Sequence, residues 1–301
     1  MKKIRKKANG NAAKSKTPLK IMVSMPNTLP FIHTAAHLSM MDIMSPPALA
    51  KVTEVLGTSE WMYTIDRQGG YPMHFNRNNS CRAVLDSGAD FWLTFDSDMV
   101  FPQTVIADLL RVMTQGDEMY DPETKRVRKV SPGEIDILSG LYFKKAPPFP
   151  PINGVFTRDD LRYWHSPINT EYKGLVRNDV IGAGCMCVRP DALRKMDAPW
   201  FQYQEIVTLD GHHDLSSEDV WFCMRAQDCG LQVWTDTRMV CGHITGFSAD
   251  QRHWDQFKNG TPESPGLFDP KDGHLRMELL DEDTGRHFVR NPNAWPGTGP
   301  R

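Results

Sequence analysis

The sequence lacks three features that would place it directly in a membrane, secreted or zinc-stabilised class. No run of about 18 apolar residues occurs, which excludes a membrane-spanning helix. Polar Asn, Ala, Lys and Ser residues follow the basic start, where a secretory signal needs an apolar segment. The six cysteines form no C-x-x-C pair of zinc-ribbon spacing. We therefore expect free core thiols, no structural zinc and a reducing, cytoplasmic compartment.

Acidic residues are missing from the first 20 positions, which carry eight basic side chains. The rest of the 301-residue chain then holds 27 basic and 37 acidic side chains, a net charge of -10. We expect residues 1–18 to form a basic disordered arm. Such an arm can contact nucleic acid or an anionic surface, or it can be a solvated tail, and the acidic body favours the tail.

The composition predicts one globular domain with a polar extension. With 40% hydrophobic and 24% charged residues, the chain can bury a sizeable core. Beyond residue 250 it becomes polar and rich in Gly and Pro. We expect a single domain over residues 19–250, and a C-terminal extension over residues 251–301 that lies on the acceptor side or acts as a lid.

Strand and helix patterns alternate through the first half of the chain. The strands are expected at 19–26, 60–66, 90–95 and 135–143, and the helices at 46–56, 76–87 and from about Pro102. This alternation predicts an α/β fold with a mostly parallel central sheet and helices on both faces.

The second half adds further elements to this sheet and a small antiparallel extension. We expect an exposed loop at 115–134, a hairpin at 154–164, a strand at 179–190, a helix at 190–196, a helix from an N-cap at Ser216 to Gly230, and strands at 231–236 and 238–244.

An apolar strand delivers two aspartates at its carboxyl end in the segment "FWLTFDSDM". In an open parallel sheet, this end of the strands is where ligands bind. Asp96 and Asp98 can face one divalent cation directly or through water, and oxygen ligands suit Mg²⁺ or Mn²⁺ that bridges to phosphates. The same D-x-D pattern also occurs in surface turns, so it predicts a metal site only together with other features.

Four segments occur in one order around this pattern. They are "NRNNSCRAVLDSGADFWLTFDSDM", "DVIGAGCMCVRPDAL", "SSEDVWFCMRAQDCGLQVW" and "VCGHITG". Together they resemble the family 2-like glycosyltransferases with the GT-A fold, over about residues 19–247. The resemblance implies a Rossmann-like GT-A domain that moves a sugar from a nucleotide-diphosphate donor to an acceptor hydroxyl.

The resemblance also implies metal-binding and catalytic residues. Asp98 would coordinate the metal, Asp96 would contact the ribose or the metal's water shell, and His243 would be a further metal ligand. Asp219 matches the family's catalytic base, with Glu218 as its neighbour.

Further positions match the family's donor site. The implied donor-binding residues are Pro26, Asp66, Arg77, Asn78, Asp96, Gly182, Ala183 and Gly184. The first two lie where the family holds the base, and the next two match its Arg-Asn pair near the nucleotide. The last three match the small-residue segment beside the donor sugar.

The chemistry of sugar transfer requires these residue types. Breaking a sugar–diphosphate bond leaves negative charge on the phosphates, which Mn²⁺ or Mg²⁺ stabilises. The acceptor hydroxyl needs a carboxylate within hydrogen-bond reach to take its proton. Direct attack from the face opposite the diphosphate inverts the anomeric carbon. We therefore expect an inverting hexosyltransferase that uses a UDP-sugar.

Each candidate also has a structural interpretation. Glu218 and Asp219 could stabilise a helix start as capping residues, and His243 could be a hydrogen-bonded strand histidine. Gly182 and Gly184 could serve close packing alone. Two other functions remain open: a nucleotidyltransferase that makes nucleotide sugars, although "SMPNTLPFIH" lacks its Gly-rich basic loop, and a non-catalytic nucleotide-sugar binding module.

The sequence departs from the family where specificity is set. After the second strand only Asp66 of the usual acidic pair is present, which leaves the base open. The Gln-x-x-Arg-Trp signature of processive synthases is absent, although Gln251, Arg252 and Trp254 are similar to it. We expect a single transfer to an acceptor off the membrane. The compact form resembles bacteriophage glycosyltransferases, some of which act on modified bases in DNA and others on proteins. The acceptor stays open between these two, and the acidic body argues against DNA.

Overall fold

The computed structural model describes most of the region expected to form the domain. Its residues are 18–27, 32–57, 59–66, 71–121, 124–159, 162–208, 213–245, 248–249, 251, 268–269, 274–275, 277–281 and 286–290. The expected arm lies outside the described residues except for Pro18, and the expected extension is described only in part. Their roles, and the domain boundaries, stay predictions. No helix in this described part is long and apolar enough to cross a membrane.

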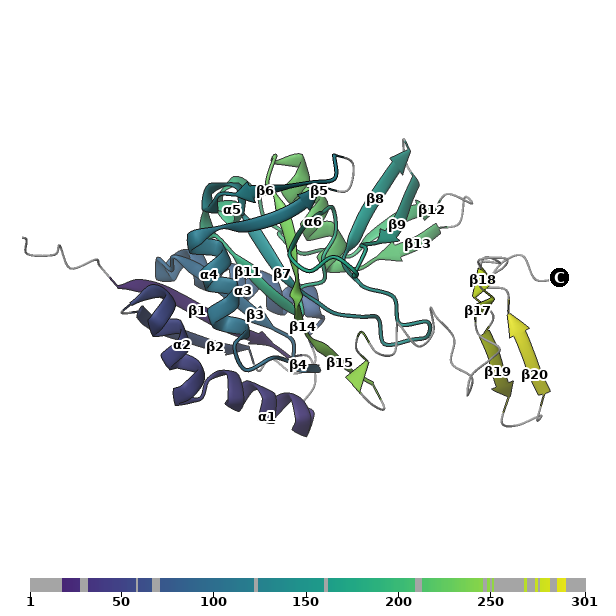
Figure 1. The fold of residues 1–301 in the computed structure, drawn as a ribbon, viewed down its shortest axis with the longest axis horizontal. Coiled ribbons are helices and arrows are strands. Elements are labelled where there is room, and N and C mark those ends of the chain that lie inside the picture. The colour runs from purple at the N-terminus through teal and green to yellow at the C-terminus, as the bar shows by residue number, and fades with distance from the viewer. Residues whose placement is uncertain are drawn as a thin grey trace, which may run out of the picture.

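A nine-stranded mixed sheet forms the centre of the molecule (Figure 1). In spatial order its strands are β2 (Ser59–Asp66), β1 (Leu19–Pro26), β3 (Phe91–Phe95), β11 (Cys185–Val188), β7 (Ile137–Leu141), β14 (Val233–Val240), β10 (Leu175–Asn178), β5 (Asp117–Asp121) and β6 (Arg126–Val130). Strands β2, β1, β3, β7 and β14 run in one direction, and β11 runs against them between β3 and β7. The predicted α/β class is confirmed.

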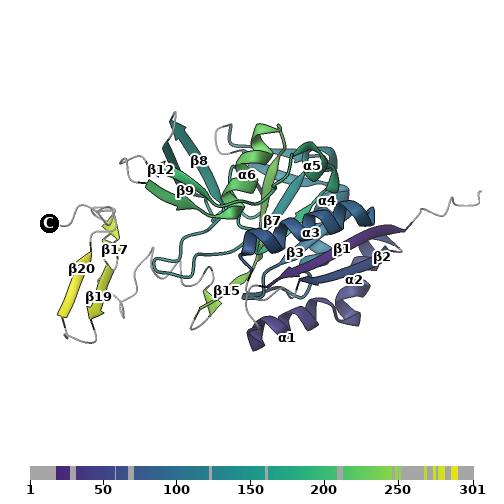
Figure 2. The ribbon, with the colours of Figure 1, turned by 180° about the vertical axis from the view of Figure 1, so that it is seen from behind.

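Helices cover both faces of this sheet. On one face lie α1 (Thr34–Ile43), α2 (Pro46–Leu56) and α4 (Val105–Gln115), and on the other lie α3 (Met73–Ser87), α5 (Pro190–Lys195) and α6 (Glu218–Asp228). Strand β1 shows why: Ile21 and Val23 join the core cluster of the first face, while Met22 between them joins that of the second. Figure 2, seen from behind, shows α3 across the sheet.

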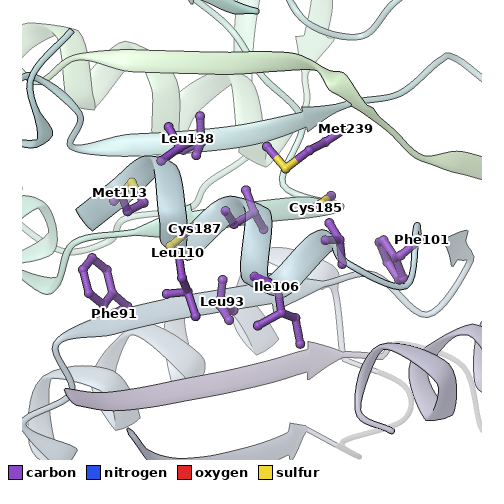
Figure 3. Close-up of a cluster of buried hydrophobic side chains, with 14 of the residues drawn as sticks. Phe91, Leu93, Phe101, Ile106, Leu110, Met113, Leu138, Cys185, Cys187 and Met239 are labelled. Carbon is purple, nitrogen blue, oxygen red and sulfur yellow. The ribbon is translucent and has the colours of Figure 1, made fainter. Parts of the chain in front are cut away.

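The apolar stripe of α4 forms the centre of the first core. Ile106, Leu110 and Met113 recur at helical spacing and are buried against the sheet, as their periodicity predicts. Figure 3 shows them facing Leu93 of β3 and Leu138 of β7. The helix itself begins at Val105, after the turn that follows Pro102.

Three smaller groups of strands complete the described structure. The first is a four-stranded sheet of β8 (Gly154–Asp159), β9 (Arg162–Pro167), β12 (Gln204–Thr208) and β13 (His213–Ser216). The second is a three-stranded sheet of β4 (Met99–Val100), β15 (Gly242–Ile244) and β16 (Ser248–Ala249). The third consists of two strand pairs, β17 (Phe268–Asp269) with β18 (His274–Leu275) and β19 (Met277–Asp281) with β20 (Arg286–Arg290). The predicted hairpin at 154–164 is confirmed as β8–β9. The pair β8–β9 is antiparallel, as predicted. The sequence analysis did not predict β12 and β13, which also pair antiparallel, whereas β9 and β12 are parallel.

Four local predictions were wrong. The polar stretch 115–134 is not a loop but contains the hairpin β5–β6 and the short 3-10 helix η1 (Pro132–Glu134), because charged side chains also suit an exposed edge strand. The strand expected at 179–190 exists only as β11, since the glycine segment before it turns. The N-cap of α6 is Ser217, not Ser216. Residues 231–244 form one long strand, β14, and the short β15.

The α4 core gives a test of the fold. Leu110 is fully buried, so Leu110→Ala leaves a cavity and should lower the free energy of unfolding by about 2–5 kcal/mol. Chemical denaturation measures this change. Leu38→Ala removes a side chain that is 59% exposed on α1 and should change stability by less than about 0.5 kcal/mol. Equal losses in both variants would contradict the described packing.

Candidate active site

Several chain segments meet at one edge of the central sheet. Strands β1 and β3 end there side by side, and the antiparallel β11 begins there, because Cys185 pairs with Phe95. The Ser97 hydroxyl donates to Asn27 Oδ1 at 3.1 Å, and the Asp96 amide donates to the Gly184 carbonyl at 3.0 Å. This is the edge where open α/β sheets bind ligands.

Arg77 of α3 connects the two predicted acidic motifs beneath this edge. Its Nη1 donates to Glu218 Oε1 at 2.7 Å, and its Nη2 donates to both Asp96 carboxylate oxygens at 2.8 and 2.9 Å. The guanidinium lies over the Phe201 ring, 5.6 Å from its centroid. Only 3% of the Arg77 side chain is exposed. The two ion pairs of Arg77 are therefore buried, where an unpaired charge would strongly destabilise the folded protein.

The pKa values of this cluster follow from burial and charge. Burial raises the pKa of Asp96, although the positive charge of Arg77 acts against it and the charge of Asp98 adds to it. Burial also raises the pKa of Glu218, again opposed by Arg77 and assisted by Asp219. Burial acts to lower the pKa of Arg77, yet the carboxylates raise it well above its ordinary value. Arg77 therefore keeps its charge and favours ionised partners.

Asp98 and His243 are brought together by the pairing of β4 with β15. His243 lies opposite Met99, and the Ile244 amide donates to the Asp98 carbonyl at 2.8 Å. The His243 Nε2 atom is 3.7 Å from Asp98 Oδ2. Its Nδ1 is 2.8 Å from the Phe143 carbonyl, which can only accept, so Nδ1 carries the hydrogen. In a neutral imidazole Nε2 then presents a lone pair towards Asp98.

This arrangement fits half of a metal site. A lone pair and a carboxylate facing each other favour a cation between them, and two metal bonds of about 2.1 Å span up to about 4.2 Å. The carboxylate suits Mg²⁺ or Mn²⁺, and the imidazole suits a transition metal rather than Mg²⁺. Among the described residues, however, no group of three or more His, Cys, Asp or Glu side chains could hold a metal ion. Asp96 is instead paired with Arg77, so its predicted part in the metal site, directly or through water, stays a prediction.

Lys145 occupies the cation position beside Asp98. Its Nζ lies 2.5 Å from Asp98 Oδ2. Burial acts to raise the pKa of Asp98, but the Lys145 ammonium group, and His243 when its Nε2 carries a proton, hold it below its usual range. Asp98 is therefore an ionised carboxylate, 39% exposed and open to exchange of its partner.

Asp219 lies next to Glu218 but has a different environment. Its Oδ1 accepts from the Val220 amide at 2.9 Å and from the Ser217 hydroxyl. It is only partly buried, whereas Glu218 is 6% exposed and paired with Arg77. The N-cap Ser217 makes no side-chain hydrogen bond to the helix backbone, whereas Asp219 itself accepts a first-turn amide, so stabilisation of the helix start stays an interpretation of this motif beside the catalytic one. Asp219 is the better placed of the two to take a proton.

The glycine segment encloses the Tyr142 hydroxyl. A Cβ atom on Gly182 would lie 1.9 Å from Tyr142 Oη, and one on Gly184 would lie 3.0 Å from it and 3.3 Å from Asp96 Oδ2. The Gly184 amide donates to Tyr142 Oη at 2.8 Å. Burial, and then the charge of Asp219, raises the pKa of Tyr142 well above its ordinary value. The close-packing interpretation of these glycines therefore holds, and a donor contact by Gly182, Ala183 or Gly184 stays a prediction.

The side-chain amide of Asn78 makes all of its described hydrogen bonds to backbone groups of the protein. Its Nδ2 donates to the carbonyls of His74 and Phe201, and its Oδ1 accepts from the amides of Trp200 and Phe201. These four bonds fix the segment that carries Phe201 beneath Arg77. A nucleotide contact by Asn78 stays a prediction, and this geometry favours a positioning role.

Pro26 and Asp66 end neighbouring strands. They are partners in the parallel register of β1 and β2, so both lie at the ligand edge of the sheet. Their contact with a base stays a prediction. Arg252 and Trp254, which are similar to part of the signature of processive synthases, lie outside the described residues.

Sequence reasoning missed Tyr142, Lys145 and Tyr203. Tyr142 directly follows β7, and Lys145 lies three residues further along the chain. Their position at and just beyond the carboxyl end of the strand predicted at 135–143 was a usable signal. Tyr203 is partly exposed, and burial, then the negative charge of Glu218, raises its pKa. No sequence pattern indicates that Tyr203 approaches Glu218.

Comparisons with known proteins give only remote similarities. No family model and no curated protein matches the chain. Among solved structures, A197 from STIV is 14% identical with a TM-score of 0.44, over 75% of this chain and 86% of that one. GalNAc-T7 with UDP, GalNAc and Mn²⁺ is 9% identical with a TM-score of 0.41, over 77% of this chain and 44% of its own length.

A Drosophila β1,4-galactosyltransferase 7 complex with manganese, UDP-Gal and xylobiose is also similar. It is 13% identical with a TM-score of 0.35, over 91% of this chain and 93% of that one. Such values establish no function for this chain.

The Arg77 cluster gives a test of stability and its pH dependence. Arg77→Met leaves two buried carboxylates without their partner and should lower the free energy of unfolding by about 3–5 kcal/mol at pH 7. The carboxyl pKa values then lie above those of the unfolded chain. The loss of unfolding free energy is therefore largest above the pKa that the two carboxyl groups have in the folded variant. It should become smaller as pH falls towards about 5, because the buried carboxylates are then protonated. Urea denaturation at several pH values measures it.

Arg82→Met provides the control for this cluster. Arg82 lies on the same helix but is exposed, and its described contact is with Asn79. Its replacement should change stability by less than about 0.5 kcal/mol at every pH. A deficit in Arg77→Met that does not depend on pH would contradict the account of the buried carboxylates.

Proposed function

We propose that this protein is a metal-dependent glycosyltransferase that moves a sugar from a nucleotide-diphosphate donor to an acceptor hydroxyl. The observation that supports this most is the Asp98–His243 pair at the ligand edge of the sheet, 3.7 Å apart. A half-site of this kind needs additional oxygen ligands, and the diphosphate of a donor supplies them. The sequence resemblance to GT-A glycosyltransferases points to the same chemistry.

The residues divide into binding, positioning and proton-transfer roles. Asp98 and His243 would hold Mn²⁺ or Mg²⁺ together with the donor diphosphate. Bound there, the cation neutralises the charge that develops on the leaving phosphates. Arg77 positions Asp96 beside this site through the bonds described above, and Asp96 is then placed for the ribose or for metal-bound water.

Asp219 would act as the base for the acceptor. It lies at the first turn of α6, where backbone N–H groups favour a carboxylate, and its second oxygen accepts no described hydrogen bond. Taking the proton of the acceptor hydroxyl as that oxygen attacks the anomeric carbon gives an inverted product. Glu218 supports this geometry through its ion pair with Arg77.

The donor can be found by ligand stabilisation. A ligand that binds only the folded state raises its stability, by about 2.7 kcal/mol at 100 times its dissociation constant. We expect a nucleoside diphosphate, with UDP first among them, to raise the melting temperature in the presence of Mn²⁺ and to have little effect with EDTA. A panel of nucleotides and nucleotide sugars tested by thermal shift identifies the base and the sugar. No stabilisation by any nucleotide with Mn²⁺ would contradict the proposal.

Two substitutions separate binding from transfer. Asp98→Asn should weaken Mn²⁺-dependent binding of the donor by at least about tenfold, because metal sites are sensitive even to their supporting residues. Asp219→Asn should leave that binding unchanged and lower turnover by about 10²–10⁴-fold. Calorimetry measures the binding, and release of the nucleoside diphosphate measures the turnover.

Asp228→Asn is the matched control for the base. Asp228 ends the same helix and is exposed, so its replacement should change neither quantity. Turnover that survives in Asp219→Asn would remove this residue as the base. Nucleotide binding without turnover in the parent protein would indicate a binding module.

A further inference from the structure

The proline-rich loop after β7 carries a lysine to the proposed metal site. Lys145 lies two residues after Phe143, and the Phe143 carbonyl accepts a hydrogen bond from His243 Nδ1. The Lys145 Nζ atom lies 2.5 Å from Asp98 Oδ2. The same loop therefore contacts both members of the Asp98–His243 pair. Neither the sequence motifs nor the proposed roles above use this lysine.

The loop holds Lys145 in place through its backbone. The Lys144 amide donates to the Pro150 carbonyl at 2.9 Å, and the Ile152 amide donates to the Tyr142 carbonyl at 3.0 Å, which closes the loop at its base. Phe149 is 4% exposed and packs with Phe143 in a separate core cluster. Because the prolines also restrict the backbone, the ammonium group moves chiefly by rotation of its own side chain.

The ammonium group of Lys145 and a metal ion would compete for the same carboxylate. Asp98 is ionised and 39% exposed, and Lys145 is 44% exposed, so water and ligands reach both groups. A partly exposed ion pair contributes little to stability and exchanges readily. A divalent cation shared with His243 has the higher charge and a second ligand, which favours displacement of the ammonium group.

We propose that Lys145 is a built-in counter-ion of Asp98 that transfers to the donor diphosphate when a divalent cation takes its place. This inference rests on the proposed function. The displaced ammonium group remains on a fixed loop beside the anionic diphosphate, and lysine is a suitable point charge for phosphate oxygens. In the absence of nucleotide Lys145 opposes metal binding, and in its presence Lys145 supports nucleotide binding. The affinity for the metal should therefore be higher in the presence of the nucleotide than in its absence.

The proposal predicts opposite effects of one substitution. Lys145→Met removes the competitor, so Mn²⁺ alone should bind about two- to fivefold tighter, which corresponds to the weak energy of an exposed pair. The same variant should bind UDP at saturating Mn²⁺ about tenfold or more weakly, because a charge-assisted phosphate contact is lost. Electron paramagnetic resonance of free Mn²⁺ measures the first affinity, and calorimetry measures the second. Lys145→Arg should retain UDP binding.

The neighbouring lysine provides the control for this test. Lys144→Met removes one positive charge from the same loop, but Lys144 has no described contact with Asp98, so neither affinity should change by more than about twofold. Unchanged Mn²⁺ affinity in Lys145→Met would overturn the inference, and so would unchanged UDP affinity or equal effects of both lysines. A parent protein that binds neither Mn²⁺ nor UDP would instead overturn the proposed function, and the inference with it.

Discussion

The buried guanidinium of Arg77 is the constraint on which the candidate site depends. It joins the end of β3, through Asp96, to the start of α6, through Glu218, although these segments are far apart in the chain. The two largely buried carboxylates would repel each other and lose hydration without this partner. Asn78 supports the arrangement from the same helix, because its amide fixes the segment with Phe201 beneath the guanidinium. The position of Asp219 follows from that of Glu218.

A second pairing completes the site independently of Arg77. The short strands β4 and β15 place His243 next to Asp98, and the Phe143 carbonyl orients the imidazole. The two clusters are adjacent, since the charge of Asp98 acts on Asp96 and Tyr142 packs edge-on against His243 with ring centroids 5.6 Å apart. The site thus combines a firmly paired inner cluster with an outer carboxylate whose partner can change. Such a division suits the proposed reaction, in which a charged donor binds and a charged product leaves.

The sequence predicted the elements better than the contacts between them. Strong signals, such as the helical spacing in α4 and the strand that ends at Asp96, led to correct elements because local patterns determine them. The hairpin β5–β6 was missed because charged residues suit both loops and exposed edge strands. The placement of His243 depends on the long-range pairing of β4 with β15, and the burial of Arg77 depends on its long-range ion pairs with Asp96 and Glu218. Neither follows from local pattern. The resemblance placed Arg77 near a nucleotide, which stays a prediction, but gave no sign of its ion pairs with two carboxylates.

The account is tested most directly by the ligands of Mn²⁺ bound with UDP, observed by pulsed electron paramagnetic resonance. We predict phosphorus coupling from the diphosphate and nitrogen coupling from one imidazole, with the nitrogen signal lost in His243→Gln. Phosphorus coupling without any nitrogen coupling in the parent protein would contradict the claim that distant segments converge to form this site.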